Sequence, residues 1–367
     1  MTIDKMILTA GPSITEKEIN YVTDAVTNGW NNNWNSYLSR FEDAFSKYLN
    51  VSHATTTSSC TGALHLGLLA CGIGKGDEVI VPEITWVATA SAVAYTGATP
   101  VFSDIDEGSW CLNLQSVESL ITSRTKAILP VHLYGHPANM PKVMALAEKY
   151  NLYVIEDAAP SIGAEVAGKK TGSFGHISGF SFQGAKILVT GEGGMLVSND
   201  KTIFDKAKFL GDHGRDPSKP LAAIEIGYKY KMSNIQAALG LAQIERANEL
   251  IERKRTINAH YRDNLKNLDR VEVSCELPGC KSNNWMTSIE IIEADNEMRE
   301  QVIKSLKENN VDSRPVFSPM SSLPMFTRNE DNPVAYRIGK SALNIPSGHN
   351  LTQDQIDHVC DVLIQIL

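Results

Sequence analysis

Ser181-Phe182-Gln183-Gly184-Ala185-Lys186, followed by Thr190-Gly191-Glu192-Gly193-Gly194, is the stretch of sequence that decides the fold. It places one lysine on a turn of small residues between two apolar runs. Upstream, the apolar run Val154-Ile155-Glu156-Asp157 ends in an acid. Such an acid can pair with the pyridine nitrogen of pyridoxal phosphate, and such a lysine can form the Schiff base with its aldehyde. The pattern therefore predicts a pyridoxal-phosphate-dependent aminotransferase.

Each residue of this pair also has a simpler interpretation when it is taken alone. Asp157 would be a helix cap or a surface acid after a strand, and Lys186 would be a solvated loop lysine, as most of the 34 Lys and Arg residues are. The apolar residues after Lys186 favour a Schiff-base lysine, because burial lowers the pKa of an amine and so favours imine chemistry. The two residues together predict the cofactor site.

Outward from this stretch, short apolar runs alternate with helical patterns. Strands are predicted at 78–82, 99–103, 127–131, 152–156, 177–182 and 194–198, and helices at 14–28, 37–48, 61–71, 86–95 and 140–150. This alternation predicts βαβ units and a mostly parallel sheet covered by helices on both faces. One long helix from 232 to 267 should then lead to a smaller α+β unit, with a strand at 285–292 and helices at 295–309 and 353–367. We expect a large domain at 1–250 and a small C-terminal domain at 251–367.

Bulk composition restricts the partners. The 367 residues carry a net charge of −8, with 43% hydrophobic and 21% charged residues, which is typical of a globular protein. The acidic balance argues against a nucleic acid or an anionic membrane as partner. The six cysteines show no metal-ligand spacing, so no metal is expected. The N-terminal residues lack a signal-peptide pattern and no run reaches the ~18 apolar residues of a membrane helix, so we expect a cytoplasmic protein.

Two further segments are candidates for cofactor contacts. Ser58-Ser59-Cys60-Thr61-Gly62-Ala63 precedes a helix without early acids, where free N–H groups and hydroxyls would bind a phosphate. An ordinary N-cap is the alternative. Trp86 follows a strand, where its indole would stack on a cofactor ring or belong to the core. Gly227-Tyr228-Lys229-Tyr230-Lys231-Met232 would meet an anionic group or form a solvated charged face.

These motifs resemble the DegT/DnrJ/EryC1/StrS family of sugar aminotransferases, and most closely its perosamine synthase branch, from about Ala10 to the C-terminus. The resemblance implies a fold type I (aspartate-aminotransferase-like) large domain with a mostly parallel seven-stranded sheet, a small C-terminal domain, and a homodimer with active sites at the interface. Besides the segments quoted above, it rests on four motifs: Gly172-Ser-Phe-Gly175, Gly227-Tyr-Lys-Tyr-Lys-Met-Ser-Asn234, Ser313-Arg-Pro315 and Asn344-Ile-Pro-Ser347.

The resemblance also implies roles for individual residues. Lys186 would be the Schiff-base lysine and proton shuttle, and Asp157 the partner of the pyridine nitrogen. The Thr61 and Gly62 amides and the Ser181 hydroxyl would hold the phosphate. Trp86 would occupy the position that stacks on the cofactor ring, and Lys229 the position that reaches the phosphate of the partner's cofactor. Apart from the resemblance, Tyr228, Lys231, Arg314 and Ser318 are candidates for contact with the substrate. A structural arginine at 314 and a plain loop around Ser318 are equally good interpretations.

L-Glutamate is the amino donor that this family implies, and a nucleotide-linked keto-sugar for polysaccharide or O-antigen biosynthesis is the acceptor, with GDP-4-keto-6-deoxymannose, which would give GDP-perosamine, as the best candidate. A TDP- or UDP-linked keto-sugar or a smaller keto-phosphate is the alternative. A sugar dehydratase of the same fold would carry histidine in place of Lys186. A cofactor-binding regulator would carry a basic DNA-binding module.

Two positions depart from the family pattern. Pro160 stands where the family usually has Gln or Glu near the phenolic oxygen of the cofactor, and it can donate no hydrogen bond. Lys229 stands where the family usually has an Asn that reaches the partner's cofactor. A lysine would make that contact as a charged pair or would reach an anionic group of the substrate.

Overall fold

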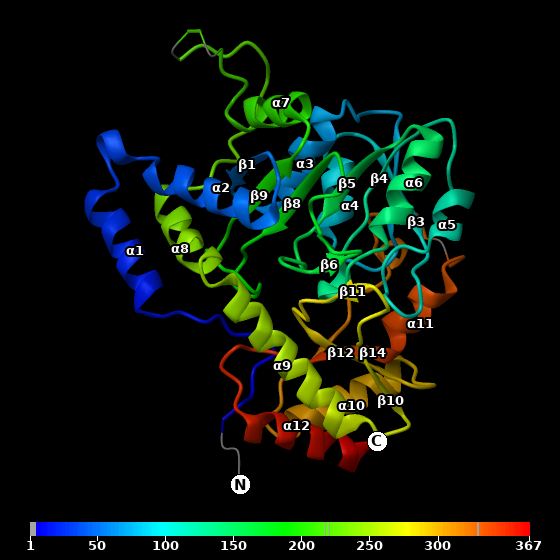
Figure 1. Cartoon of the computed structure of the whole chain (residues 1–367). Coiled ribbons are helices and arrows are strands. Elements are labelled where there is room, and N and C mark those ends of the chain that lie inside the picture. Colours follow the sequence, from blue (N-terminus) through cyan, green and yellow to red (C-terminus); the bar gives the residue numbers. More distant parts are fainter. Residues whose placement is uncertain (1–4, 217, 220, 329) are drawn as a thin grey trace.

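The computed structural model describes residues 5–216, 218–219, 221–328 and 330–367. The prediction that the N-terminus lacks a signal peptide falls partly on residues 1–4, which lie outside the described residues. A seven-stranded sheet in the order β1-β9-β8-β5-β4-β2-β3 forms its centre (Figure 1). β9 runs antiparallel to both of its neighbours, whereas the pairs from β8 to β3 are parallel. The predicted fold class is confirmed. The strands are β1 (His53–Thr57), β2 (Glu78–Pro82), β3 (Thr99–Ser103), β4 (Thr125–Ile128), β5 (Tyr153–Asp157), β8 (Ile177–Ser181) and β9 (Gly194–Ser198).

Helices cover both faces of this sheet. Along β2, Ile80 belongs to one apolar core, while Val79 and Val81 belong to the core on the other side. Successive side chains of a strand point to opposite faces, so a fully apolar strand requires cover on both. One core includes residues of α3 (Cys60–Ala70), α4 (Ala88–Tyr95) and α7 (Lys201–Gly211), and the other includes residues of α2 (Ser36–Leu49), α5 (Leu114–Ser119), α6 (Met140–Tyr150) and α8 (Asn234–Ile244).

Local sequence sets several helix ends. α1 (Glu16–Asn28) begins with a capping box, in which the Thr15 hydroxyl accepts from the backbone and the Glu18 carboxylate accepts from Thr15 N at 2.7 Å. α2 and α6 both end at an asparagine in the left-handed region, Asn50 (φ 56°) and Asn151 (φ 53°). These short-range rules explain why the predicted ends of the helices agree closely with the structure.

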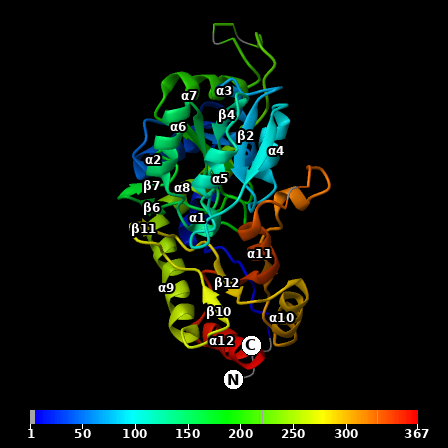
Figure 2. The same ribbon diagram turned by 90° about the vertical axis from the view of Figure 1, so that its right-hand side faces the viewer.

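The prediction of one helix from 232 to 267 is wrong. The segment forms α8 and α9 (Ala247–Leu265), and Arg246 between them has φ −109° and ψ 7°. The Arg246 guanidinium binds Glu18 of α1 at 2.7 Å, so the break is held by a contact that is distant in sequence. Neither glycine nor proline marks it. The break lets α8 pack on α1 and α2 while α9 leads to the second unit (Figure 2).

The second unit is an antiparallel sheet in the order β10-β12-β14-β13. Its core gathers residues of α9, α10 and α12 and also includes Ile7, which bridges to Val311. The small C-terminal α+β unit is present, and the division at residue 250 stays a prediction. Its elements are β10 (Val271–Val273), β12 (Thr287–Ile291), α10 (Asn296–Glu308), β13 (Arg314–Pro315), α11 (Pro333–Ser341), β14 (Ala342–Ile345) and α12 (Gln353–Ile366).

A small three-stranded sheet joins the two units. β11 (Cys280–Lys281) pairs with β6 (Glu165–Val166), which pairs with β7 (Lys169–Lys170). The connection between β10 and β12 of the second sheet is therefore bound to the segment that follows β5. Three short 3-10 turns complete the described elements: Asn31–Asn33, Leu133–Gly135 and Met320–Ser322. Among the described residues, no helix combines the length and the apolar character that crossing a bilayer needs.

Candidate active site

Asp157 is the last residue of β5 and lies at the carboxyl edge of the sheet, where α/β folds bind ligands. Asp157 is 5% exposed, and each oxygen of its carboxylate has a hydrogen-bond partner. The Thr89 hydroxyl donates to Oδ2 at 2.7 Å, and the Ala159 N–H donates to Oδ1 at 3.1 Å. The Cys60 thiol lies 3.9 Å from Oδ1. Burial raises the pKa of Asp157, and the Thr89 bond opposes this rise.

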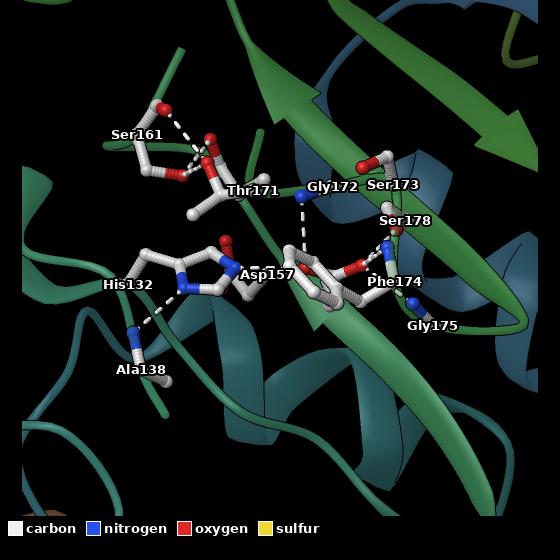
Figure 3. A network of polar contacts seen from close by, with 12 residues as sticks. His132, Ala138, Asp157, Ser161, Thr171, Gly172, Ser173, Phe174, Gly175 and Ser178 are labelled. Carbon is white, nitrogen blue, oxygen red and sulfur yellow. Dashed lines mark hydrogen bonds and ion pairs between the residues drawn. The ribbon is translucent and has the colours of Figure 1, made fainter. Parts of the chain in front are cut away.

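The preceding residue, Glu156, anchors this end of the strand. Its fully buried carboxylate accepts from the backbone N–H groups of Gly172, Phe174 and Gly175 at 2.6–2.8 Å and lies 3.0 Å from His132 Nε2. Figure 3 shows His132 beside Asp157, with its Nδ1 accepting from Ala138 N–H at 3.0 Å. His132 Nε2 therefore carries the proton and donates to Glu156. Although burial raises the pKa of Glu156, these bonds lower it below its usual value.

Lys186 lies on the loop between β8 and β9. The loop is closed by backbone bonds, including Lys186 N to Gln183 O (2.8 Å) and Gly184 N to Gly191 O (2.9 Å). Burial lowers the pKa of Lys186 to about 8, and the negative charge of Asp157 opposes this fall. The structure therefore brings the predicted amine and the predicted acid within electrostatic reach of each other, although they are far apart in the sequence.

The predicted phosphate contacts meet at the start of α3. Ser181 pairs with Gly194 in the sheet, and a Cβ on Gly194 would lie 2.5 Å from the Ser59 carbonyl carbon. Only glycine permits this approach, which places Ser181 beside the helix N-terminus that carries Thr61. The first turn holds no acid, so its N–H groups favour an anion. The Gly62 N–H donates to the capping Ser59 hydroxyl at 3.1 Å, so its contact with a phosphate stays a prediction.

Trp86 is 61% exposed and belongs to a run of aromatic rings. Its ring lies 5.7 Å from that of Phe317, which stacks on Tyr134 at 5.3 Å, and Tyr134 stacks on Trp285 at 6.0 Å. The Trp285 ring reaches Lys186, whose Nζ lies 3.5 Å from its centroid. The rings thus connect the predicted stacking residue with the predicted Schiff-base lysine.

Three other predicted residues do not join this group in the single chain. Lys229 is exposed and forms a β-bridge with Asp212. Lys231 Nζ lies 3.1 Å from the Asp212 carboxylate. Lys231 and Asp212, but not Lys229, line a cavity of about 680 Å³, and neither Asp157 nor Lys186 lines it. Tyr228 packs on His65 at 4.8 Å. The contact of Lys229 with a phosphate in a partner subunit stays a prediction.

The remaining predicted substrate contacts lie in β13 and on the segment that follows it. Arg314 is exposed, and its guanidinium lies 3.8 Å from the Asp312 carboxylate. Ser318 is exposed and directly follows Phe317, so the chain brings it to the aromatic run. Pro160, the departure from the family pattern, presents its carbonyl to the Asn283 side chain at 3.0 Å. These three roles stay predictions.

Several residues of the site were missed by sequence reasoning. Thr85, just before α4, and Thr89, in its first turn, are four positions apart, and their hydroxyls are 3.1 Å from each other. Because Thr89 gives its proton to Asp157, Thr85 donates to Thr89. Tyr134 and Trp285 come from distant segments, and no local pattern marks them. The spacing of the two threonines was the one signal available in the sequence.

These residues fit pyridoxal phosphate. Its ring nitrogen needs an acid, its aldehyde an amine with a lowered pKa, and its phosphate an anion site, and the structure supplies Asp157, Lys186 and the start of α3. No group of three His, Cys, Asp or Glu residues within the described part of the chain is placed to hold a metal ion.

Comparison with known proteins gives the family. The model of the DegT/DnrJ/EryC1/StrS aminotransferase family matches residues 12–364. The GDP-perosamine synthase of Escherichia coli O157:H7 is 42% identical over 95% of both chains, and that of Caulobacter vibrioides is 41% identical over 98% of both. A Streptococcus pneumoniae protein assigned as a sugar aminotransferase and solved in its PMP form has a TM-score of 0.93 and 25% identity, over 98% of this chain and 97% of that one. The chain therefore belongs to the DegT/DnrJ/EryC1/StrS aminotransferase family, and it is an aminotransferase that uses pyridoxal phosphate.

Proposed function

We propose that this enzyme transfers the amino group of L-glutamate to GDP-4-keto-6-deoxymannose and so makes GDP-perosamine for polysaccharide or O-antigen biosynthesis. The observation that carries the proposal is the identity of 38–42% with three GDP-perosamine synthases over 95–98% of this chain. We place the reaction in the cytoplasm and in a homodimer.

Bound pyridoxal phosphate supplies an aldehyde that accepts the amino group and a ring that withdraws electrons from the reacting carbon. Lys186 would bind that aldehyde. Once glutamate displaces it, the Lys186 amine would take the proton from the amino acid Cα and return it to the cofactor carbon C4′. A pKa of about 8 suits this work, because the amine then exchanges protons near neutral pH.

Asp157 would hold the proton on the ring nitrogen. Its carboxylate is buried, and hydrogen bonds from Thr89 and Ala159 fix both oxygens. The carboxylate is therefore already oriented before the reaction, and no free energy is spent on reorienting it. The Ser181 hydroxyl and the Thr61 and Gly62 amides would bind the phosphate, and Trp86 would pack on the ring. Lys229 would reach the phosphate in the partner subunit.

Pro160 and the substrate contacts shape the acceptor side. Since Pro160 donates no hydrogen bond, we propose that a water meets the phenolic oxygen of the cofactor. Tyr228, Lys231, Arg314 and Ser318 are proposed to contact the nucleotide sugar, where the two cations would offset its phosphate charge.

The test is a panel of acceptors assayed with glutamate, with 2-oxoglutarate and the amino-sugar mass as readouts. The panel holds GDP-4-keto-6-deoxymannose, TDP- and UDP-linked keto-sugars and a keto-phosphate. Preferential amination of the GDP-sugar supports the proposal, and preferential amination of another member refutes the acceptor. Lys186→Ala should abolish turnover, whereas Lys170→Ala, whose amine lies 4.8 Å from the Tyr48 ring, should leave it unchanged. Full turnover in Lys186→Ala would refute the role of the lysine.

A further inference from the structure

The indole of Trp285 forms the surface on which the Lys186 amine lies. Lys186 Nζ is 3.5 Å from the ring centroid, and Trp285 is 6% exposed. An ammonium over the face of an indole is attracted by the negative charge of the ring face, and the attraction is strongest where water is excluded. The contact therefore favours the protonated form of Lys186, in the same direction as the Asp157 charge.

Trp285 is held in this position from two sides. Its indole N–H donates to the carbonyl of Ala185, the neighbour of Lys186, at 2.7 Å. Its backbone N–H donates to the Asn283 side chain at 3.0 Å, and its carbonyl accepts from the buried Lys254 amine at 3.2 Å. The ring therefore has a fixed relation to the loop that carries the lysine.

The same turn is bound to the segment that follows Asp157. The Asn283 amide donates to the carbonyls of Pro160 and Ile162 at 3.0 and 2.9 Å. Residues 283–285 thus connect the acid-bearing strand with the lysine-bearing loop.

The displaced lysine is a neutral amine that takes the proton of the amino acid Cα, and the resulting ammonium must stay in place until it gives that proton up. On the basis of the proposed function, we propose that the Trp285 ring holds the Lys186 ammonium in the interval between these two proton transfers and so acts as a positioning residue for the proton shuttle. The alternative is that Trp285 only packs on Tyr134 and keeps water away from the amine.

The two roles predict different changes in the pKa of Lys186 when the ring is removed. Trp285→Leu keeps an apolar side chain but removes the ring face, so the pKa of Lys186 should fall by about one pH unit. Trp285→Phe keeps an aromatic ring, so the pKa of Lys186 should stay close to its wild-type value. Trp110→Leu is the matched control, because the Trp110 ring also packs on Tyr134, at 6.4 Å.

The assay is the pH dependence of amine modification in the cofactor-free full-length protein. Acetic anhydride is added over a range of pH, and the modified fraction of each lysine is measured by peptide mass spectrometry. A lower pKa of Lys186 in Trp285→Leu, with an unchanged pKa in Trp110→Leu, supports the proposal. An unchanged or raised pKa in a folded Trp285→Leu overturns it, because the ring would then act only by packing.

Fluorinated tryptophan tests the same idea if Trp285→Leu does not fold. Incorporation of increasingly fluorinated tryptophan preserves the ring shape while weakening the negative ring face, so the pKa of Lys186 should fall stepwise. Lys170 is the internal control, because its amine lies over the Tyr48 ring, which stays unmodified. A Lys186 pKa that is independent of fluorination overturns the proposal.

A second readout uses the holoenzyme. In single turnover with glutamate, Trp285→Leu should shift the acidic limb of the pH–rate profile down by about one pH unit and leave the dissociation constant of glutamate unchanged. An unshifted profile counts against the proposal. The labelling result does not depend on turnover, so a failure of the proposed aminotransferase roles, seen as full activity of Lys186→Ala, stays distinguishable from a failure of the Trp285 assignment.

Discussion

Replacing Thr89 with valine removes one hydrogen bond from Asp157 and keeps the volume of the side chain. The Thr89 hydroxyl lies 2.7 Å from Asp157 Oδ2, and Thr89 is fully buried. The variant leaves Oδ1 with its Ala159 N–H and leaves Oδ2 without the Thr89 donor. It also removes the acceptor of the Thr85 hydroxyl.

The size of the effect follows from the charge of the acceptor. A hydrogen bond to an ionised group contributes about 1.5–3 kcal/mol, because the buried carboxylate would otherwise lose solvation without compensation. That free energy corresponds to a rise of about one to two pH units in the pKa of Asp157. Burial already raises this pKa, so the change adds to the existing shift. We expect the glutamate half-reaction to slow by about 10- to 100-fold.

Stopped-flow absorbance of the bound cofactor after mixing with glutamate measures this rate. Thr89→Ser keeps the hydroxyl and should retain most of the rate, and it is the matched control. Both variants should melt as single transitions, which shows that the fold is kept. Equal rates for wild type and Thr89→Val, or an equal loss in Thr89→Ser, would refute the reasoning that the hydroxyl supports the carboxylate.

Three further predictions concern pH, stability and packing. Because burial lowers the pKa of Lys186 to about 8, the rate of the glutamate half-reaction should rise with pH through about 8 and then level off; a rate that falls over this range contradicts a neutral amine as the base. Burial raises the pKa of Glu18, but hydrogen bonds from Thr15, Arg246 and others lower it to about 2. The ionised Glu18 carboxylate therefore stabilises the folded protein by about 3 kcal/mol; this contribution is present above pH 4.5 and is lost as the pH falls toward 2. Urea unfolding should show Glu18→Gln less stable than wild type at pH 7 and nearly equal at pH 2; an equal difference at both pH values argues against this charge. Gly194→Ala places a Cβ 2.5 Å from the Ser59 carbonyl carbon, so cofactor affinity measured by fluorescence quenching should fall at least tenfold, and an unchanged affinity would show that β9 can move away from α3.

Much of the fold could be predicted from local patterns. The alternation of apolar runs with helical patterns predicted the parallel part of the sheet, because strand and helix periodicities depend on residues that are close in sequence. The capping box at Thr15 and the asparagines after α2 and α6 act within a few residues and are equally local. Where an end is set by a distant partner, as in the break at Arg246, the local pattern continues and gives no warning.

The candidate site divides in the same way. The order of motifs along the chain determined that an acid and a lysine would work on one cofactor, because each ends or follows a strand whose end faces the same edge of the sheet. Only the tertiary structure decided which groups surround them. Thr89 meets Asp157 across 68 positions of sequence, and Trp285 meets Lys186 across 99 positions. Such contacts depend on how the helices and the second unit pack against the edge of the sheet. This packing arises only when distant segments come together in the folded core, so no single stretch of sequence predicts it.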